Sequence, residues 1–180
     1  MTKLEGADDW ADVGIDVGMR KLAYGWPAWK QSQEIHITPG KHTRSQELAM
    51  LSKWVADRIP PGVRLWIETP YVSNGSARNP TTSLHMAETV SAILTAQPWD
   101  VEPQYVAPNT WKAAVVGNGN APKAEVGLWL SNYDLDLYAA CEDDENRVDA
   151  MCIGLYGQKR TLGVVLPPGN YRKRRRARAT

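Results

Sequence analysis

The chain has 180 residues, which is enough for one domain of ordinary size with its own hydrophobic core. Hydrophobic residues make up 43% and charged residues 23% of the sequence, values typical of a soluble globular protein rather than a disordered chain. No apolar run approaches the roughly 20 residues that a membrane helix needs, and the acidic N-terminus does not resemble a signal peptide. Two cysteines, Cys141 and Cys152, are too few for a disulfide framework or a zinc site. We therefore expect a cytoplasmic protein that does not bind membranes.

The formal net charge of +1 hides an uneven distribution of charge along the chain. Six of the 21 Lys and Arg residues lie within residues 172–180, and the other 15 stand against 20 Asp and Glu residues. We predict one folded domain over residues 1–168 and a basic, disordered tail over residues 169–180. A short block of like charge is typical of an arm that binds nucleic acid. A merely solubilising tail is the alternative.

The first half of the predicted domain begins with three strands. Residues 13–18 form a short apolar run that ends in a carboxylate and a glycine, which predicts a buried strand and a turn. Residues 22–29 and 34–38 predict two more strands, so that the three form an antiparallel meander. Apolar residues then recur at helical spacing over residues 43–58, until the Pro-Pro-Gly sequence at 60–62 ends the helix.

The next segments alternate between strand and helix. Residues 63–68 predict a second buried strand with a carboxylate at its end, and residues 69–80 are rich in Ser, Asn, Gly and Pro, as in a loop. A helix is expected over residues 82–96. Residues 101–106 favour one further strand.

The C-terminal third is expected to be helical. We predict helices over residues 108–116, 123–132 and 146–157, and an acidic loop over residues 134–145. A meander of strands followed by alternating helix and strand predicts an α/β fold with a mixed central sheet flanked by helices.

Three carboxylates from distant segments are the candidate chemistry. Asp16 and Glu68 each end a predicted buried strand, and Asp149 lies on the last predicted helix. Hard divalent cations prefer oxygen ligands, and two such cations can promote phosphodiester hydrolysis. The alternative is that each acid is capped or paired locally, as most surface acids are. The spacing alone leaves both interpretations open.

Four motifs together resemble one family. GIDVG at residues 14–18, followed by LAYG at 22–25, is similar to the first strand of RuvC-type Holliday junction resolvases, and IETPY at 67–71 is similar to their second acidic motif. The lysine-bearing segment at 108–123 and DENRVDA at 144–150 resemble the remaining two motifs, in the same order and at similar separations. Val17 departs from the pattern, since the family usually has Pro there. The resemblance covers roughly residues 13 to 157.

The resemblance implies an RNase H-like fold and a metal-dependent nuclease. Asp16, Glu68 and Asp149 match the catalytic, metal-binding carboxylates, and Mg²⁺ is the expected cofactor, with Mn²⁺ able to substitute for it. Asn146, three residues before Asp149, takes the place where the family usually has Asp or His. Its amide oxygen can still face a metal, because positions i and i+3 share a helix face. Glu145 is the alternative ligand.

The same resemblance implies the residues that contact DNA. Lys112 and Lys123 match two lysines near the cleaved strand, and Lys123 is also expected to stabilise charge during cleavage. Tyr71 matches an aromatic residue that stacks on unpaired bases at the crossover. Arg20 and Lys21 are expected to line the groove beside Asp16. Solvated helix lysines and a core tyrosine are the competing interpretations.

The expected function is to resolve four-way DNA junctions by paired symmetric nicks, as a homodimer whose interface includes the predicted helix at 82–96. Junction binding without cleavage is one alternative, because Asn146 is neutral. A small YqgF-type nuclease of the same fold is another, although it does not account for the lysine-bearing segment. Actin-like sugar kinases begin with a similar motif, but they need two such domains and a longer chain.

Overall fold

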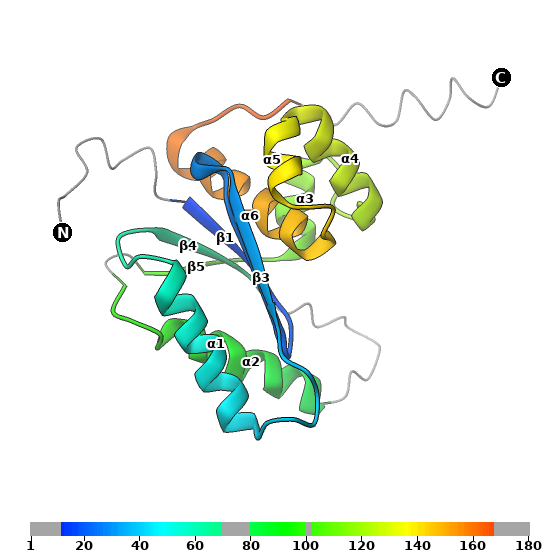
Figure 1. Cartoon of the computed structure of the whole chain (residues 1–180). Helices are drawn as coiled ribbons and strands as arrows, with labels where there is room; N and C mark the ends of the chain where they lie inside the picture. The colour runs from blue at the N-terminus through cyan, green and yellow to red at the C-terminus, as the bar shows by residue number, and fades with distance from the viewer. Residues whose placement is uncertain (1–11, 70–79, 100–101, 168–180) are drawn as a thin grey trace.

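A computed structural model describes residues 12–69, 80–99 and 102–167, in which one mixed sheet separates two layers of helices (Figure 1). Tyr71 and the basic tail lie outside these described residues. The strand pairs β1–β2 and β2–β3 are antiparallel, while β4 pairs in parallel with both β1 and β5. The strand order is β3-β2-β1-β4-β5. The strands are β1 (Asp12–Val17), β2 (Lys21–Trp26), β3 (Gln31–His36), β4 (Arg64–Glu68) and β5 (Gln104–Val106).

Alternation along β1 and β4 decides which side chains face which helical layer. Val13 and Ile15 belong to the hydrophobic cluster on one face of the sheet, which also takes Leu65 and Ile67 from β4. Trp66 belongs to the cluster on the opposite face. Because side chains alternate between the faces of a strand, Asp16 and Glu68 lie on the same face as Trp66.

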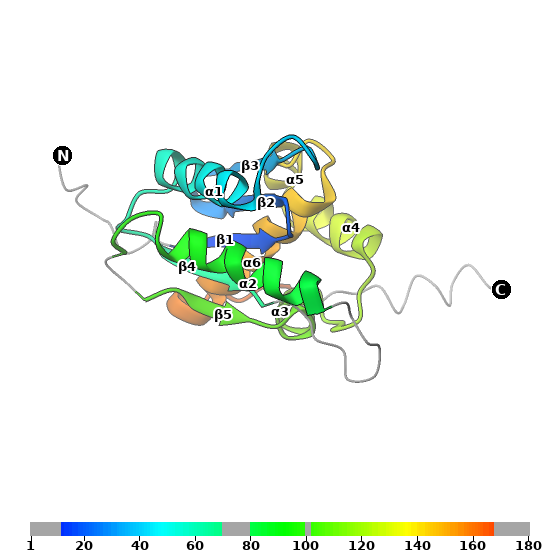
Figure 2. The ribbon, with the colours of Figure 1, turned by 90° about the horizontal axis from the view of Figure 1, so that it is seen from below.

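Helices cover both faces of the sheet, as the view in Figure 2 shows from below. On one side, α1 and α2 pack against each other and against the cluster that contains Ile15. On the other side, α6 crosses β1 and β2, with α3, α4 and α5 packed around it. No helix in the described ranges is both long and apolar enough to cross a membrane. The helices are α1 (Arg44–Arg58), α2 (Pro80–Leu94), α3 (Pro108–Val115), α4 (Lys123–Tyr133), α5 (Leu135–Ala140) and α6 (Glu145–Leu162).

Glycines allow α6 to rest directly on the sheet. Gly14 and Gly25 are register partners on β1 and β2. A Cβ atom at Gly14 would lie 2.1 Å from the backbone oxygen of Ala150, and one at Gly25 would lie 2.3 Å from the Cα of Met151. Backbone therefore approaches backbone at this crossing, and only glycine fits there. The contact fixes the height of α6 above the end of β1.

The structure corrects three predicted segments. The second strand ends at Trp26, because Pro27 begins a 3-10 helix (η2, Pro27–Trp29). The expected acidic loop contains α5, whose first turn is capped by the Asp134 side chain and whose Leu137 is buried. The last helix does not stop at Gly157 but continues to Leu162, where Gly163 adopts a left-handed conformation with φ 68°.

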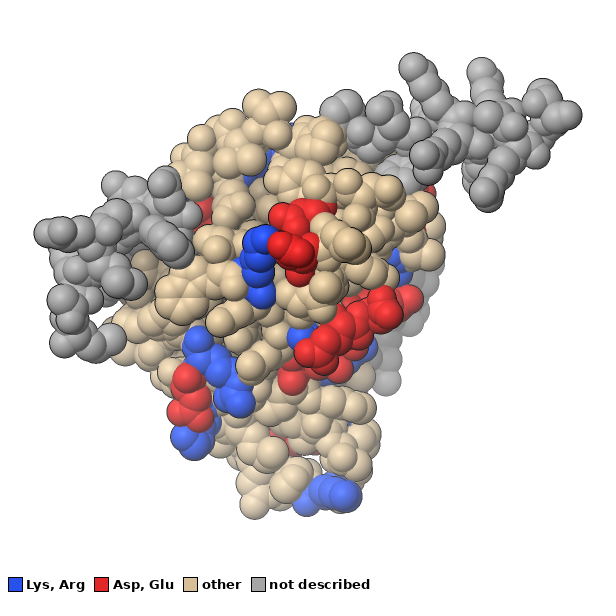
Figure 3. All heavy atoms as spheres, turned by 45° about the horizontal axis from the view of Figure 1, so that its top comes forward, with Lys and Arg blue, Asp and Glu red and all other residues tan. Residues whose placement is uncertain are grey.

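Positive and negative side chains are mixed on the face of the molecule that Figure 3 draws. On the face drawn in Figure 3, Lys and Arg side chains lie in small separate groups, several of them beside Asp and Glu side chains. Surface ion pairs of this kind include Lys53 with Asp57 at 2.9 Å and Lys30 with Asp136 at 2.5 Å. Exposed pairs contribute little to stability, and their opposite charges cancel at a distance. This face of the described residues therefore offers no broad positive surface to a polyanion.

Candidate active site

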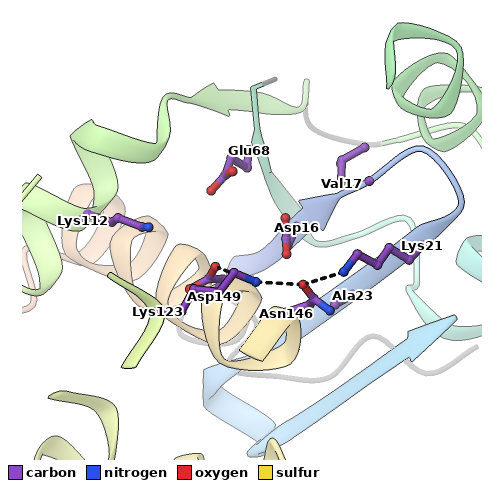
Figure 4. A pocket seen from close by; sticks show the side chains of 10 residues that line it. Asp16, Val17, Lys21, Ala23, Glu68, Lys112, Lys123, Asn146 and Asp149 are labelled. Atoms are coloured by element: carbon purple, nitrogen blue, oxygen red, sulfur yellow. Dashed lines mark hydrogen bonds and ion pairs between the residues drawn. The ribbon is translucent and has the colours of Figure 1, made fainter. Parts of the chain in front are cut away.

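A pocket of about 290 Å³ lies at the ends of β1 and β4 and brings the three predicted carboxylates together (Figure 4). Asp16 enters it from β1, Glu68 from β4 and Asp149 from α6. Segments separated by more than 50 residues thus meet at one place. Ten residues line the pocket: Asp16, Val17, Gly18, Lys21, Ala23, Glu68, Lys112, Lys123, Asn146 and Asp149.

The sheet register explains why Asp16 and Glu68 are neighbours. Ile15 and Ile67 are partners on the parallel strands β1 and β4, and each acid is the next residue along its strand. Both acids therefore leave the sheet at the same edge and on the same face. The predicted juxtaposition of these two residues is confirmed.

Asp149 lies opposite this edge, on the first turns of α6. Its residue surface is only 6% exposed, and its Oδ1 atom is buried without a hydrogen-bond partner among the described residues. Buried carboxylate oxygens are costly when they are unpaired, so this atom calls for a partner such as a water molecule or an ion. Its Oδ2 atom lies 3.8 Å from the Nζ of Lys123.

All three acids hold protons more tightly than a carboxyl group in water. Removal from water and the nearby charge of Asp16 raise the pKa of Glu68 to about 7, although a hydrogen bond from Trp111 opposes the shift. The same two causes, burial and Asp16, raise the pKa of Asp149 to about 6. Burial also raises the pKa of Asp16, against the opposing effect of Lys123 and other lysines. A positive ion in the pocket would offset both the cost of burying the ionised carboxylates and the repulsion between them.

Three lysines enter the same pocket. The Nζ of Lys112 donates a hydrogen bond to the backbone oxygen of Ala121 at 3.2 Å, which holds it on the α3 side. Lys123 begins α4, and Lys21 begins β2; both are exposed. The structure thus places Lys21, which was expected beside Asp16, and the two lysines of the lysine-bearing segment, Lys112 and Lys123, in the pocket with the carboxylates.

Asn146 sits between the two exposed lysines. Its Oδ1 atom accepts a hydrogen bond from Lys123 at 3.0 Å and another from Lys21 at 3.2 Å, and Figure 4 shows both. Its Nδ2 atom donates to the Oε2 of Glu34 on β3 at 3.2 Å. The amide oxygen predicted to face a metal is therefore already engaged by two ammonium groups.

Two predicted site residues point elsewhere, and one lies outside the described ranges. Arg20 does not line the pocket; its Nε donates to the buried Glu47 at 2.7 Å, because the turn after β1 directs it towards α1. The expectation that Arg20 lines the groove is wrong. Glu145 is also absent from the pocket wall and makes an exposed ion pair with Lys123 at 3.7 Å. The position of Tyr71 is not described.

Sequence reasoning missed two residues that touch the site. The Nε1 of Trp111 donates to the Oε2 of Glu68 at 2.6 Å and holds that oxygen of the carboxylate in place. Trp111 belongs to the lysine-bearing segment, but the sequence assigned it no role of its own. Glu34 on β3 carried no signal at all, because only the pairing of β3 with β2 brings it near α6.

The pocket supplies the ligands that a hard divalent cation prefers. Asp16, Glu68 and Asp149 offer only oxygen atoms, and Asp149 has a buried oxygen without a partner. Within the described residues, however, no three His, Cys, Asp or Glu side chains stand close enough to hold an ion as they are. Like charges repel, and Lys123 already approaches Asp149. The donor set fits a cation, but its side chains must draw together to bind one.

Known proteins with a similar sequence are junction nucleases. The crossover junction endodeoxyribonuclease RuvC of Chlamydia trachomatis serovar L2 is 34% identical over 158 residues, a match that covers 79% of this chain and 88% of the relative. The RuvC of Chlamydia muridarum is 31% identical over 157 residues with the same coverage. No protein-family model matches the chain.

Solved structures show a similar fold. Thermus thermophilus RuvC has a TM-score of 0.62 and 18% sequence identity, with 86% of this chain and 98% of that chain covered. T. thermophilus RuvC in complex with a Holliday junction substrate has a TM-score of 0.63 at 18% identity, with coverage of 84% and 94%. At these identities the likeness concerns the fold, and it confirms the predicted RNase H-like architecture.

Proposed function

Because the chain belongs to the RuvC family of crossover junction endodeoxyribonucleases, we propose that it resolves four-way DNA junctions by hydrolysing one phosphodiester in each of two strands. One observation supports this activity above the others. Three carboxylates with raised pKa values and three lysines share one open pocket at the end of the sheet. Acidic and basic groups gathered in this way suit the hydrolysis of a phosphate ester.

Asp16, Glu68 and Asp149 are the proposed ligands of Mg²⁺, for which Mn²⁺ can substitute. When bound, such a cation lowers the pKa of water and offsets the charge of the leaving oxygen. Trp111 keeps one oxygen of Glu68 occupied, so that the carboxylate presents its other oxygen to the pocket. The unpartnered Oδ1 of Asp149 supports the assignment of this residue as a ligand.

Lys112 and Lys123 are the proposed contacts to the DNA backbone. Both side chains line the pocket that holds the carboxylates, where they can contact a phosphate bound there. Lys123 is the nearer to Asp149, at 3.8 Å, and is the proposed residue that stabilises negative charge as the phosphodiester breaks. Lys21 approaches from the β2 side.

Tyr71 is proposed to stack on bases that are unpaired at the crossover. It follows Glu68 by three residues in the sequence. Tyr71→Ala should then impair cleavage of junctions far more than binding to plain duplex, since only the crossover exposes base faces. An equal loss on both substrates would favour a tyrosine that belongs to the core.

A homodimer is proposed because a four-way junction has two related strands to cut, and a two-fold symmetric pair of subunits provides two pockets. The proposed interface includes α2. This helix carries Leu84, which is 58% exposed, and its inner face already packs on α1 and the sheet. In such a dimer Leu84 would be buried at the subunit contact.

The experiment that tests this function uses a four-way junction labelled in turn on each strand. We expect nicks at symmetric positions in two opposite strands when Mg²⁺ is present, and an intact junction when it is left out. A linear duplex of the same sequence is the control and should remain uncut. A junction that is shifted in a gel but never nicked would instead indicate a protein that binds junctions without cutting them. That alternative rests on the neutral Asn146, which stands where the family usually has Asp or His. Equal cutting of the linear duplex would indicate a nuclease without junction specificity.

A further inference from the structure

The side chain of Asn146 is held on both sides, which fixes the direction of its amide. Its Nδ2 donates to the carboxylate of Glu34 at 3.2 Å, and its Oδ1 accepts from Lys21 at 3.2 Å and Lys123 at 3.0 Å. A flipped amide would point its NH₂ group at two ammonium groups and its oxygen at a carboxylate. Only one orientation therefore satisfies these contacts.

The amide oxygen has no capacity left for a metal in this arrangement. A carbonyl oxygen has two lone pairs, and the two lysines use both of them. A divalent cation at Oδ1 would have to displace at least one ammonium group and approach the other closely. Because the Asn146 side chain is neutral, it offers no negative charge that would offset the displacement of an ammonium group.

The charges that line the pocket balance once its three carboxylates are ionised. Asp16, Glu68 and Asp149 contribute three negative charges when ionised, and Lys21, Lys112 and Lys123 contribute three positive ones. One divalent cation makes this wall positive, which suits the approach of a phosphodiester. A second cation would add two more positive charges to a wall that has no further carboxylate to receive them.

We propose that each chain binds one divalent cation through Asp16, Glu68 and Asp149, and that the ammonium groups of Lys21 and Lys123, held by Asn146, take the place of a second cation. The inference rests on the proposed function and specifies its metal requirement. Asn146 is then a residue that positions the two ammonium groups, and Glu34 fixes the orientation of its amide. Fixed cations at this point can stabilise charge on the phosphate without any ligand exchange.

The stoichiometry of Mn²⁺ binding tests the inference on the full-length wild-type protein without DNA. Electron paramagnetic resonance of free Mn²⁺ during a titration at pH 7.5 reports the number of ions bound per chain. We expect one for the wild type. Two bound ions, both lost in Asp149→Asn, would overturn the inference.

Asn146→Asp changes the group on which the inference depends. The new carboxylate adds a negative charge beside Lys21 and Lys123, so we expect two Mn²⁺ ions per chain for this variant. Asn132→Asp is the matched control, because it adds the same charge to an exposed position on α4 and should still bind one. If Asn146→Asp keeps its fold and binds one ion, Asn146 does not limit the stoichiometry and the inference fails.

Lys21→Met separates this inference from the proposed function. It should still bind one Mn²⁺, while its nicking of a four-way junction at saturating Mn²⁺ falls by roughly 100-fold. Nicking at the wild-type rate would show that Lys21 supplies no needed charge, and would overturn the inference while the nuclease assignment stands. A wild-type protein that binds no Mn²⁺ and nicks no junction would contradict the proposed function itself.

Discussion

The carboxyl group of Glu68 is removed from water and lies near Asp16, and both effects raise its pKa to about 7. Asp149 is raised to about 6 for the same reasons. Between pH 4 and pH 7 the folded, metal-free protein therefore keeps protons that the unfolded chain has released. Since the folded state binds more protons in this window, its stability falls as the pH rises through it.

Glu68→Gln should remove part of this pH dependence, because the amide has the same shape and does not ionise. For the metal-free wild type we expect the free energy of unfolding to drop by on the order of 2 kcal/mol between pH 5 and pH 7.5, and clearly less in the variant. Urea unfolding at the two pH values measures both quantities. Glu102→Gln removes an exposed carboxylate before β5 and is the control that should behave as the wild type. If the free energy of unfolding falls as much between the two pH values in Glu68→Gln as in the wild type, the raised pKa of Glu68 is not the cause of the pH dependence.

At the residue scale, the sequence predicted the side chains that come from contiguous motifs. Asp16, Glu68 and Asp149 each lie in a motif that resembles one of the family, so the resemblance implied that they belong to one site, although their spacing alone left this open. The direction of a side chain in a turn has no such signature. Arg20 was therefore placed in the groove, whereas the turn sends it to Glu47. Glu34 was missed because its role depends on strand pairing.

At the scale of elements, the contact between α6 and the sheet positions Asp149 above Asp16. This contact depends on glycines at the crossing, since a Cβ atom at Gly14 or Gly25 would collide with the backbone of α6. The predicted strands and helices were mostly correct because they bury one face at a regular period. The helix that was predicted as a loop, α5, spans only six residues, too short for a period to emerge, and it is capped by an acid within an acidic stretch.

Gly14→Ala should displace α6 and so move Asp149 away from Asp16. The added Cβ would lie 2.1 Å from the Ala150 oxygen, and neither backbone can yield easily. We expect a loss of about 3 kcal/mol or more in the free energy of unfolding, at the upper end of typical overpacking costs. Nicking should fall further than junction binding, because only nicking needs the three carboxylates together.

Gly127→Ala is the matched control on α4. A Cβ there would meet only the Tyr138 ring, at 3.7 Å, which is an ordinary contact. Replacing a glycine within a helix should stabilise the protein by about 0.5–1 kcal/mol and leave nicking unchanged. Urea midpoints and junction assays on both variants check the pair. A Gly14→Ala variant as stable and active as Gly127→Ala would show that α6 does not rest on this glycine.

At the scale of the whole molecule, the charge of the chain is divided between an acidic body and a basic end. Residues 172–180 hold six Lys and Arg residues, whereas 15 basic and 20 acidic residues make up the rest. On the face drawn in Figure 3, the body offers no broad basic surface. Phosphate contacts outside the pocket are therefore expected to come in large part from the C-terminal residues.

Truncation after Pro168 should weaken binding to a junction without changing where it is cut, because arginines of this kind contact phosphates rather than base edges. Each lost phosphate contact flattens the plot of log affinity against log salt by about 0.9, so six residues allow a change of roughly 5 per chain at most, and about half that is expected. Binding measured from about 50 to 200 mM salt, with the full-length protein as control, reports this slope. An unchanged slope would exclude contact between these residues and DNA.

Asp16→Asn tests whether Asp16, Glu68 and Asp149 form the catalytic centre of a junction nuclease. The amide keeps the shape of the side chain but removes the charge that a cation needs. We expect nicking of a four-way junction to fall by roughly 1,000-fold or more while affinity for the junction stays the same or increases. Asp136→Asn, which changes an exposed aspartate on α5, should nick at the wild-type rate. Full nicking by Asp16→Asn, with its fold and junction binding intact, would contradict the claim.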